Sequence, residues 1–405
     1  MSEWKEVIAT DFCIEVTDGT HDSPKSVSMG RYLLTSKHLQ EYQLDFANAY
    51  QISQEDYEKA IARSKVDQYD VLFSMIGTIG VTHRVSMANV DFAVKNMGIF
   101  KMGGDEIKSM WLYYWLKTRK AKEYINSTLS GTTQGYITLK ALRNFPIQVP
   151  NEDLMKSITS FLSSLDSKIA VNRRICENLE AQAQALFKHW FIDFAPFKNG
   201  KFVESELGMI PEGWRVGKLE ELGDIVGGAT PSKVEDSYYT SKGIAWLTPK
   251  DLSNKLSKFT SRGEIDLTQE GYNSCSAKLM PKGSVLFSSR APIGYLTIAK
   301  NDICTNQGFK SVVPKYAGTA YIYYLLKTNT KRIESMSSGT TFKEASGSLM
   351  KSLAVIIPPK SIIDNYEASV VEIFNEQEVI EDESTRLSTL RDTLLPKLMS
   401  GQIKV

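Results

Sequence analysis

Residues 152–191 decide the fold, and they read EDLMKSITSFLSSLDSKIAVNRRICENLEAQAQALFKHWF. Their larger, mostly apolar residues recur in alternating steps of four and three, which is the heptad spacing of a coiled coil. No Pro or Gly interrupts the stretch. At ~1.5 Å per residue it predicts a helical rod of roughly 60 Å, whose apolar seam needs an equally long partner. The seam consists of Ile158, Leu162, Leu165, Ile169, Asn172, Cys176, Leu179, Ala183, Leu186 and Trp190.

The chain itself supplies that partner. Adding 208 to every seam position gives a second seam with the same steps and no residue inserted or lost. Its members are Tyr366, Val370, Ile373, Gln377, Ile380, Ser384, Leu387, Arg391, Leu394 and Leu398. The polar members Asn172, Gln377 and Arg391 are expected to fix the register at some cost in stability. We predict that the two long helices pair as an antiparallel coiled coil.

The rest of the chain is also repeated, at offsets between 208 and 214 residues. The matching segments are Trp4 and Trp214, residues 34–39 (LTSKHL) and 247–252 (LTPKDL), 71–74 and 285–288 (both VLFS), Asn96 and Asn306, 113–118 (YYWLKT) and 323–328 (YYLLKT), and 130–133 and 338–341 (both SGTT). Such self-similarity predicts a tandem duplication of a globular domain followed by a rod.

This pattern predicts five parts of an α/β protein. They are a mixed α/β domain over 1–150, a long helix over 151–193, a linker over 194–210, a second mixed α/β domain over 211–358, and a long helix with a tail over 359–405. Within the first domain we expect strands over 71–76, 81–85 and 145–149 and one helix over 105–125. Pro196, Gly200 and Gly208 punctuate the linker. An insertion near Asn199 and Gly200 is therefore expected to alter the separation of the two domains.

Composition indicates a globular protein without a leader or an anchor. The 405 residues suffice for two or three cores, and the 48 Lys and Arg residues nearly balance the 47 Asp and Glu residues. The N-terminus has no apolar signal region, and no run approaches the length of a membrane span. The 4 cysteines have no CxxC spacing and indicate a reducing, cytoplasmic compartment.

Charge is unevenly distributed. Basic residues are in excess over 211–358, so the second domain could present an electropositive face. The last long helix carries an acidic run over 372–383 that would repel phosphates.

Two similar heads at a fixed separation suit a pseudo-symmetric ligand, and duplex DNA read at two half-sites is such a ligand. Matching loops differ, with Lys37 and His38 against Lys250 and Asp251, so the heads are expected to read different sequences.

Three segments resemble a known family. They are residues 186–194 (LFKHWFIDF), 208–214 (GMIPEGW) with 219–222 (LEEL), and 390–401 (LRDTLLPKLMSG). With both heads and both rods, the chain resembles over its full length the specificity (S) subunit of a type I restriction-modification system.

The resemblance implies a subunit without catalysis of its own. Two target recognition domains would each read one half of an asymmetric, bipartite site in double-stranded DNA, and the rods would bind two modification (M) subunits. Restriction (R) subunits would join through that core. The resemblance implies no cofactor in this chain, S-adenosylmethionine in the M subunits, and ATP and Mg in the R subunits.

Individual contacts are expected from residue type and position. Lys37 and Lys250 occupy matching positions just after a strand, where a lysine would meet a phosphate. The further candidates for DNA contact are His21, His38, Arg84, Gln134, Lys242, Lys255, Lys258, Arg262 and Arg290. For the M subunit we expect Phe187, Trp190 and Phe191, as apolar residues flanking the seam that one partner helix would leave exposed.

Catalytic readings fit less well. An amino-methyltransferase needs an Asn/Asp-Pro-Pro-aromatic motif, which the surroundings of Pro358 and Pro359 do not supply. Residues 226–233 lack the spacing of a phosphate-binding loop. Asp91, Glu106 and Lys108 can be forced into the pattern of a nuclease site. However, Glu106 and Lys108 fall at an expected helix start, and the second domain has no equivalent residues. Two alternatives stay open, namely the recognition part of a fused nuclease-methyltransferase and a scaffold that binds no DNA.

Overall fold

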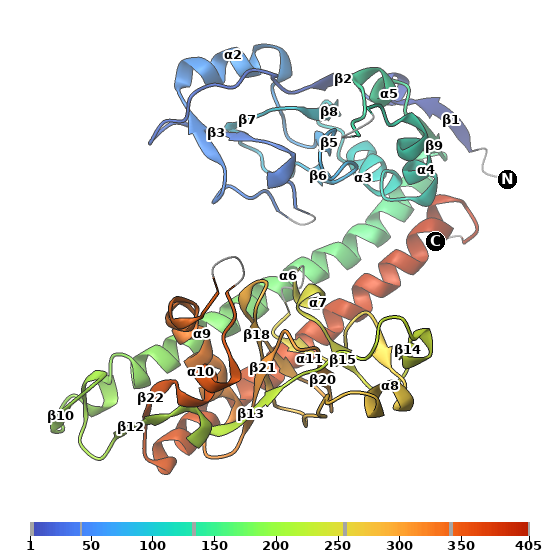
Figure 1. Cartoon of the computed structure of the whole chain (residues 1–405). Helices are drawn as coiled ribbons and strands as arrows, with labels where there is room; N and C mark the ends of the chain where they lie inside the picture. The colour runs from blue at the N-terminus through green and yellow to red at the C-terminus, as the bar shows by residue number, and fades with distance from the viewer. Residues whose placement is uncertain (1–3, 41–42, 132–134, 254–256, 340–342, 404–405) are drawn as a thin grey trace. The chain divides into compact units, whose positions relative to one another are not determined.

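The computed structural model describes residues 4–40, 43–131, 135–253, 257–339 and 343–403. The chain forms two compact units, of which unit 1 comprises residues 1–171 and 384–405 and unit 2 comprises residues 172–383. Two helices of 40 residues each run through both units, α6 (Glu152–Phe191) and α11 (Lys360–Met399). Each unit therefore holds one globular head and one part of each long helix (Figure 1). The first long helix coincides with the heptad stretch 152–191 and is slightly shorter than the expected part 151–193, and it is continuous because no Pro or Gly interrupts the heptads.

Three small sheets build the head of unit 1. The first has the antiparallel order β2 (Glu15–Asp18), β8 (Met97–Lys101), β5 (Val71–Ser74), β6 (Thr82–Arg84). The second has the order β4 (Tyr50–Ile52), β3 (Arg31–Leu34), β7 (Phe92–Val94), with β3 and β7 parallel. The third pairs β1 (Lys5–Ile8) with β9 (Pro146–Val149). Strand β5 is buried along its whole length, as its three consecutive apolar residues favour.

Short helices complete this head, and one expectation about them is wrong. They are α1 (Ala9–Phe12), η1 (Ser36–His38), α2 (Gln54–Ser64), α3 (Glu106–Trp115), α4 (Arg119–Thr128) and α5 (Leu139–Arg143). The single helix expected over 105–125 is divided between α3 and α4. The physical reason is Thr118, whose hydroxyl accepts the Ala121 N–H at 3.2 Å and so caps a new helix start.

The head of unit 1 is packed directly onto the long helices. Its core joins Trp111, Phe73 and Phe145 of the head to Leu162 of α6 and Leu395 of α11, all of them buried. Figure 1 shows the first turns of α6 and the last turns of α11 against this head. Burying a Leu or Phe side chain contributes about 1.5–3 kcal/mol, so the head and the helix ends stabilise one another.

Unit 2 repeats the sheet order of unit 1. Its largest sheet runs β13 (Gly223–Gly227), β21 (Lys310–Pro314), β18 (Val285–Ser289), β19 (Ile293–Ala299), β16 (Phe259–Thr260). Smaller sheets pair β12 (Arg215–Lys218) with β22 (Ala354–Ile357), β15 (Trp246–Leu247) with β20 (Cys304–Thr305), β14 (Tyr239–Thr240) with β17 (Asp266–Leu267), and β10 (Phe202–Ser205) with β11 (Gly208–Pro211). The order β2-β8-β5-β6 of unit 1 reappears as β13-β21-β18-β19, so the predicted tandem of mixed α/β domains is confirmed.

Helices also complete the head of unit 2. They are η2 (Ala195–Phe197), η3 (Leu219–Glu221), η4 (Asp236–Tyr238), α7 (Pro249–Leu252), α8 (Gln269–Asn273), α9 (Thr319–Met336) and α10 (Gly347–Ser352). Within the described ranges of the chain, no helix is long and apolar enough to cross a membrane.

The long helices touch in antiparallel order inside unit 2. The Tyr366 hydroxyl lies 3.5 Å from the Ala183 carbonyl oxygen, and the Asn172 amide donates to Glu383 at 2.7 Å. As the residue number falls along α6, it rises along α11. Inside unit 1, the Arg391 guanidinium of α11 pairs with Asp166 of α6 at 2.7 Å. The polar seam residues Asn172, Gln377 and Arg391 are all buried. Coiled-coil packing along the whole length stays a prediction.

The expected linker, residues 194–210, has a structure of its own. It contains η2, β10 and most of β11. Its aromatic rings pack on Trp214, with centroid distances of 5.5 Å from Phe194 and 5.1 Å from Phe197. Trp190 of α6 adds a further contact with Phe197 at 6.4 Å. These contacts bind the segment to unit 2.

Candidate functional site

In unit 2 the repeated segments gather at one edge of the head. Backbone hydrogen bonds join Ala229 to Thr305, Asn306 to Leu247, Ser289 to Gly308, and Ala345 to Ser289, at 2.7–2.9 Å. These bonds bring five loops together, which we call the second loop edge: residues 228–230, 248–250, 289–292, 305–310 and 343–346. Connecting segments of this kind commonly carry the binding residues of a rigid scaffold.

Unit 1 has an equivalent edge. Its backbone bonds join Thr20 to Val94, Lys95 to Leu34, and Ile137 to Met75, at 2.8–3.0 Å. We call residues 19–21, 35–38, 75–80, 95–97 and 135–137 the first loop edge. Both edges depend on a glycine at a close backbone approach. A Cβ on Gly19 would lie 2.3 Å from the Val94 oxygen, and one on Gly228 would lie 2.1 Å from the Asn306 oxygen.

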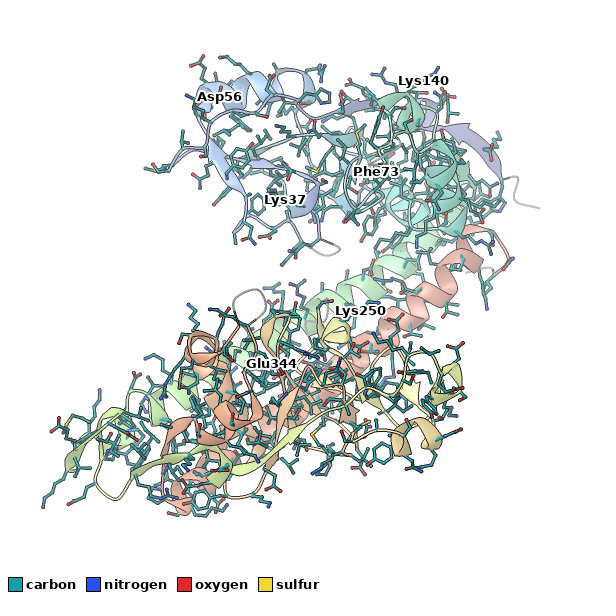
Figure 2. All side chains as sticks on the ribbon, viewed as in Figure 1. Lys37, Asp56, Phe73, Lys140, Lys250 and Glu344 are labelled. Atoms are coloured by element: carbon teal, nitrogen blue, oxygen red, sulfur yellow. The ribbon has the colours of Figure 1, made fainter. Side chains whose placement is uncertain are left out.

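Lys37 and Lys250 occupy matching positions of the sequence repeat, one on each head (Figure 2). Lys37 lies in η1 and Lys250 in α7, and both side chains are exposed. The Lys250 side chain is 83% exposed and has a loose ion pair with Glu264 at 3.4 Å, so it remains available to a ligand. Each short helix is held by the residue that follows the lysine. The Thr35 N–H donates to His38 Nδ1 at 2.9 Å, and the Thr248 N–H donates to Asp251 at 2.7 Å.

The two histidines expected at the first edge differ in exposure. His21 is exposed, with Nδ1 2.8 Å from Asn96 Oδ1 and Nε2 3.0 Å from Asp18. His38 is buried, and burial together with the neighbouring Lys37 lowers its pKa. A neutral His38 ring that accepts a backbone N–H positions the Lys37 turn and does not present itself to a ligand.

The other side chains expected to contact DNA are distributed over both units. Arg290 is on the second loop edge, where its guanidinium lies 3.6 Å from Glu344. Arg262 pairs with the buried Asp266 at 2.9 Å. Lys242 is exposed, in the loop after β14. In unit 1, Arg84 on β6 pairs with Glu106 at 3.4 Å and stacks over the Tyr69 ring at 5.4 Å. Gln134 and Lys255 lie outside the described residues.

Lys258 requires a correction, because the structure buries it. Only 4% of the residue is exposed, and its ammonium lies 2.6 Å from Glu180 of α6. It also donates to the Tyr324 hydroxyl at 3.0 Å and to the Gln377 side-chain oxygen at 3.1 Å. An ammonium enclosed in this way anchors the head to the long helices and cannot reach a ligand at the surface.

The expected partner-binding aromatics also require a correction. Phe187 and Phe191 are 2% and 5% exposed, and both belong to the core of unit 2. The Phe191 ring lies 4.8 Å from Tyr321 and 5.0 Å from Tyr366. Trp190 alone of the three is partly exposed. The head of unit 2 and α11 cover this part of α6, a tertiary contact that the seam pattern did not include.

The three residues that could be arranged as a nuclease site have other partners. Asp91 pairs with Arg31 at 3.2 Å, and Glu106 pairs with Arg84 at 3.4 Å. The Lys108 ammonium is 3.8 Å from Asp105. In the part of the chain that the structure describes, no group of three or more His, Cys, Asp or Glu residues could hold a metal ion.

Sequence reasoning missed two residues of the second loop edge. Lys310 begins β21, and its ammonium lies 3.4 Å from Glu344. Glu344 stands in unit 2 where Tyr136 stands in unit 1, since both form the same bridge with the serine of the SGTT repeat. The sequence contained a signal for Glu344, because the repeat continues past SGTT at the same offset of 208 residues. At this offset the aromatic Tyr136 is replaced by the acidic Glu344.

These features define a class of two-headed α/β protein with one loop edge on each head. A family model described as the type I restriction modification DNA specificity domain matches residues 25–181 and 211–385. The chain belongs to this family of type I restriction-modification specificity subunits, and it carries two recognition domains.

Named relatives agree with this assignment, and a solved structure agrees with the fold. The MjaIX specificity subunit of Methanocaldococcus jannaschii is 43% identical over 162 residues, which are 39% of this chain and 37% of that protein. The HindI specificity subunit of Haemophilus influenzae is 26% identical over 357 residues, which are 72% of this chain and 77% of that protein. The crystal structure of the type I S subunit from M. genitalium superposes with a TM-score of 0.59 and 14% identity, over 98% of this chain and 96% of that one. That structure supports the fold alone.

Proposed function

We propose that this chain is the DNA-reading subunit of a type I restriction-modification complex, in which each head reads one half of a bipartite site. The observation that carries the proposal is the pair of equivalent loop edges with Lys37 and Lys250 at matching places. A duplicated reader with matched phosphate contacts and differing neighbours suits two different half-sites.

The chemistry belongs to other subunits in this proposal. Two M subunits with S-adenosylmethionine would methylate the DNA, and R subunits with ATP and Mg would cleave it. The long helices would hold the M subunits and set the spacing between the half-sites. The names of the relatives support a role in specificity, and an assay of the isolated chain for methyl transfer tests whether catalysis is indeed absent from it.

The experiment compares Lys250→Ala and Lys37→Ala with the wild type, in the assembled complex and at several salt concentrations. Each lysine that neutralises a phosphate contributes about one unit to the slope of log K against log salt. Each variant should therefore weaken binding to all sequences by a similar factor and lower that slope by about one unit. Binding is measured on DNA that carries the recognition site and on scrambled DNA.

Lys315→Ala is the matched control. Lys315 follows β21 at the end of the strand away from Lys310, and its side chain is 64% exposed. It should leave affinity and salt slope unchanged. A Lys250→Ala variant that selects a different half-site would show that Lys250 reads bases and would contradict the phosphate assignment. A wild-type complex without salt-dependent, sequence-selective binding would favour the DNA-free scaffold.

A further inference from the structure

Glu344 is the acidic side chain that the second loop edge places between two cations. The Arg290 guanidinium lies 3.6 Å from one of its carboxylate oxygens, and the Lys310 ammonium lies 3.4 Å from the other. The exposed fractions of the three side chains are 39% for Glu344, 37% for Arg290 and 17% for Lys310. The carboxylate is thus held from two sides and still open to solvent.

The backbone fixes the position of this carboxylate. The Glu344 N–H donates to the Ser338 carbonyl at 2.9 Å, and the next residue, Ala345, donates to Ser289 at 2.9 Å. Arg290 directly follows Ser289, whose own N–H donates to Gly308 at 2.7 Å. Three separate loops therefore converge on one carboxylate, and Figure 2 shows Glu344 on the same unit as Lys250.

The two ion pairs are weak enough to exchange. Partly exposed pairs of this length contribute little to stability, because solvent screens them and ordering the side chains costs entropy. DNA phosphates bind Arg and Lys through charge-assisted hydrogen bonds. When DNA approaches, phosphates can therefore compete for Arg290 and Lys310, and the carboxylate is then left beside a polyanion.

A carboxylate in that position discriminates between bases. It has no hydrogen to donate, so it repels phosphates and finds no partner on the acceptor groups of guanine or thymine. It can accept a hydrogen bond from an exocyclic amino group, of which cytosine N4 is the usual partner of Glu in the major groove. A DNA site that presents this amino group compensates the carboxylate charge that DNA covers on binding. Other DNA sequences leave that charge unpaired.

We propose that Glu344 is a base-reading residue of the second head, which accepts a hydrogen bond from an exocyclic amino group of cytosine, and that Arg290 and Lys310 position its carboxylate before DNA binds. This inference rests on the proposed function of the loop edges. Tyr136 takes the equivalent place on the first head, so the discrimination applies to one half-site only.

The test is Glu344→Gln in the assembled complex, bound to a DNA library in which both half-sites are randomised. A good contact of this kind discriminates against the wrong base by roughly 5-fold to 150-fold in the ratio of affinities. The preference for cytosine at one position of one half-site should fall by a factor within that range. Affinity for scrambled DNA should rise, because a negative charge has been removed, and the other half-site should be read as before.

Two controls separate the possible failures. Tyr136→Phe, at the equivalent place in unit 1, should leave the half-site of the second head unaltered. Arg290→Gln keeps the carboxylate and removes one of its positioning groups, so it should lower the same base preference. This variant provides the test if Glu344→Gln fails to assemble. A drop in melting temperature with unchanged preferences at both half-sites would overturn the inference and leave Glu344 as a structural ion-pair partner. If Lys250→Ala behaves as expected while Glu344→Gln changes no base preference, only this inference fails. If the wild-type complex selects no sequence, the proposed function fails.

Discussion

Lys258 shows how a single buried charge connects the second head to both long helices. Its ammonium pairs with Glu180 of α6, bonds to Gln377 of α11 and lies 3.8 Å from the Phe374 ring centroid. Burial lowers the pKa of Lys258, and the Glu180 carboxylate opposes that shift. Burial would raise the pKa of Glu180, but the ammonium groups of Lys258 and Lys327 hold it below its usual range. Lys258 is therefore buried against an opposite charge, and the side chain of Glu180 is 22% exposed.

Replacing Lys258 by Met should destabilise the chain strongly. Removal of one partner of a buried ion pair costs about 3–5 kcal/mol. We expect the lower part of that range, because Glu180 keeps its ion pair with Lys327 and its hydrogen bond from the Tyr324 hydroxyl. Chemical denaturation of the full chain measures the loss, with Lys250→Ala as the exposed control that should stay within about 0.5 kcal/mol of the wild type. The double variant with Glu180→Gln should lose less than the sum of the single variants. A loss below about 1 kcal/mol for Lys258→Met would contradict the anchoring role.

At the scale of elements, the long helices combine an apolar seam with a few buried polar residues. Asn172 is fully buried, and its amide nitrogen donates to Glu383 at 2.7 Å. Among the described residues, no group bonds to its side-chain oxygen. A polar residue at a seam position lowers the stability of a coiled coil while it fixes the register of the helices.

Asn172→Leu should therefore raise the stability of the helix pair. Leucine has a similar size and leaves no unpaired oxygen in the seam, so we expect a gain of about 1 kcal/mol. Thermal unfolding of the full chain measures this gain. Asn365→Leu, on the exposed face of α11, is the matched control and should have an effect within about 0.5 kcal/mol. A loss of stability in Asn172→Leu would show that the bond to Glu383 outweighs the unpaired oxygen.

At the scale of the whole molecule, only the two long helices cross from one unit to the other. The crossings lie between Val171 and Asn172 in α6 and between Glu383 and Ser384 in α11. The segment around Asn199 and Gly200 lies inside unit 2, where Phe194 and Phe197 pack on Trp214. Spacing between half-sites, where it depends on this chain, should therefore depend on the helices. The sequence alone had suggested that an insertion in the segment around Asn199 and Gly200 would also alter it.

Inserting one heptad into both helices at the crossings should lengthen the preferred DNA spacer. Seven residues add roughly 10 Å, which corresponds to about three base pairs at about 3.4 Å each. Methylation of a DNA set in which only the spacer varies measures the change, and both half-site sequences should stay the same. An insertion in one helix alone leaves a seam without a partner and should abolish assembly. Insertion at Asn199 and Gly200 is the control. A spacer change caused by that insertion would contradict the conclusion that the two long helices set the spacing.

The sequence by itself determined the features that depend on local periodicity and on the internal repeat. The heptads of residues 152–191 predict the continuous helix α6, and the repeated segment VLFS corresponds to β5 and to most of β18. The repeated segments gave the tandem heads and the matched lysines Lys37 and Lys250. These features could be predicted because backbone conformation and side-chain period are properties of neighbouring residues.

Only the tertiary structure decided which residues are enclosed and which meet across the chain. It buried Lys258 and Phe187, although a basic aromatic surface and a seam-flanking aromatic were expected there. It brought Arg290 and Lys310 to Glu344, from positions more than thirty residues away along the chain. The periodicity of a segment shows which of its faces is apolar, but not which distant segment covers that face. Burial and ion pairing depend on that second choice, which is made when the heads pack on the helices.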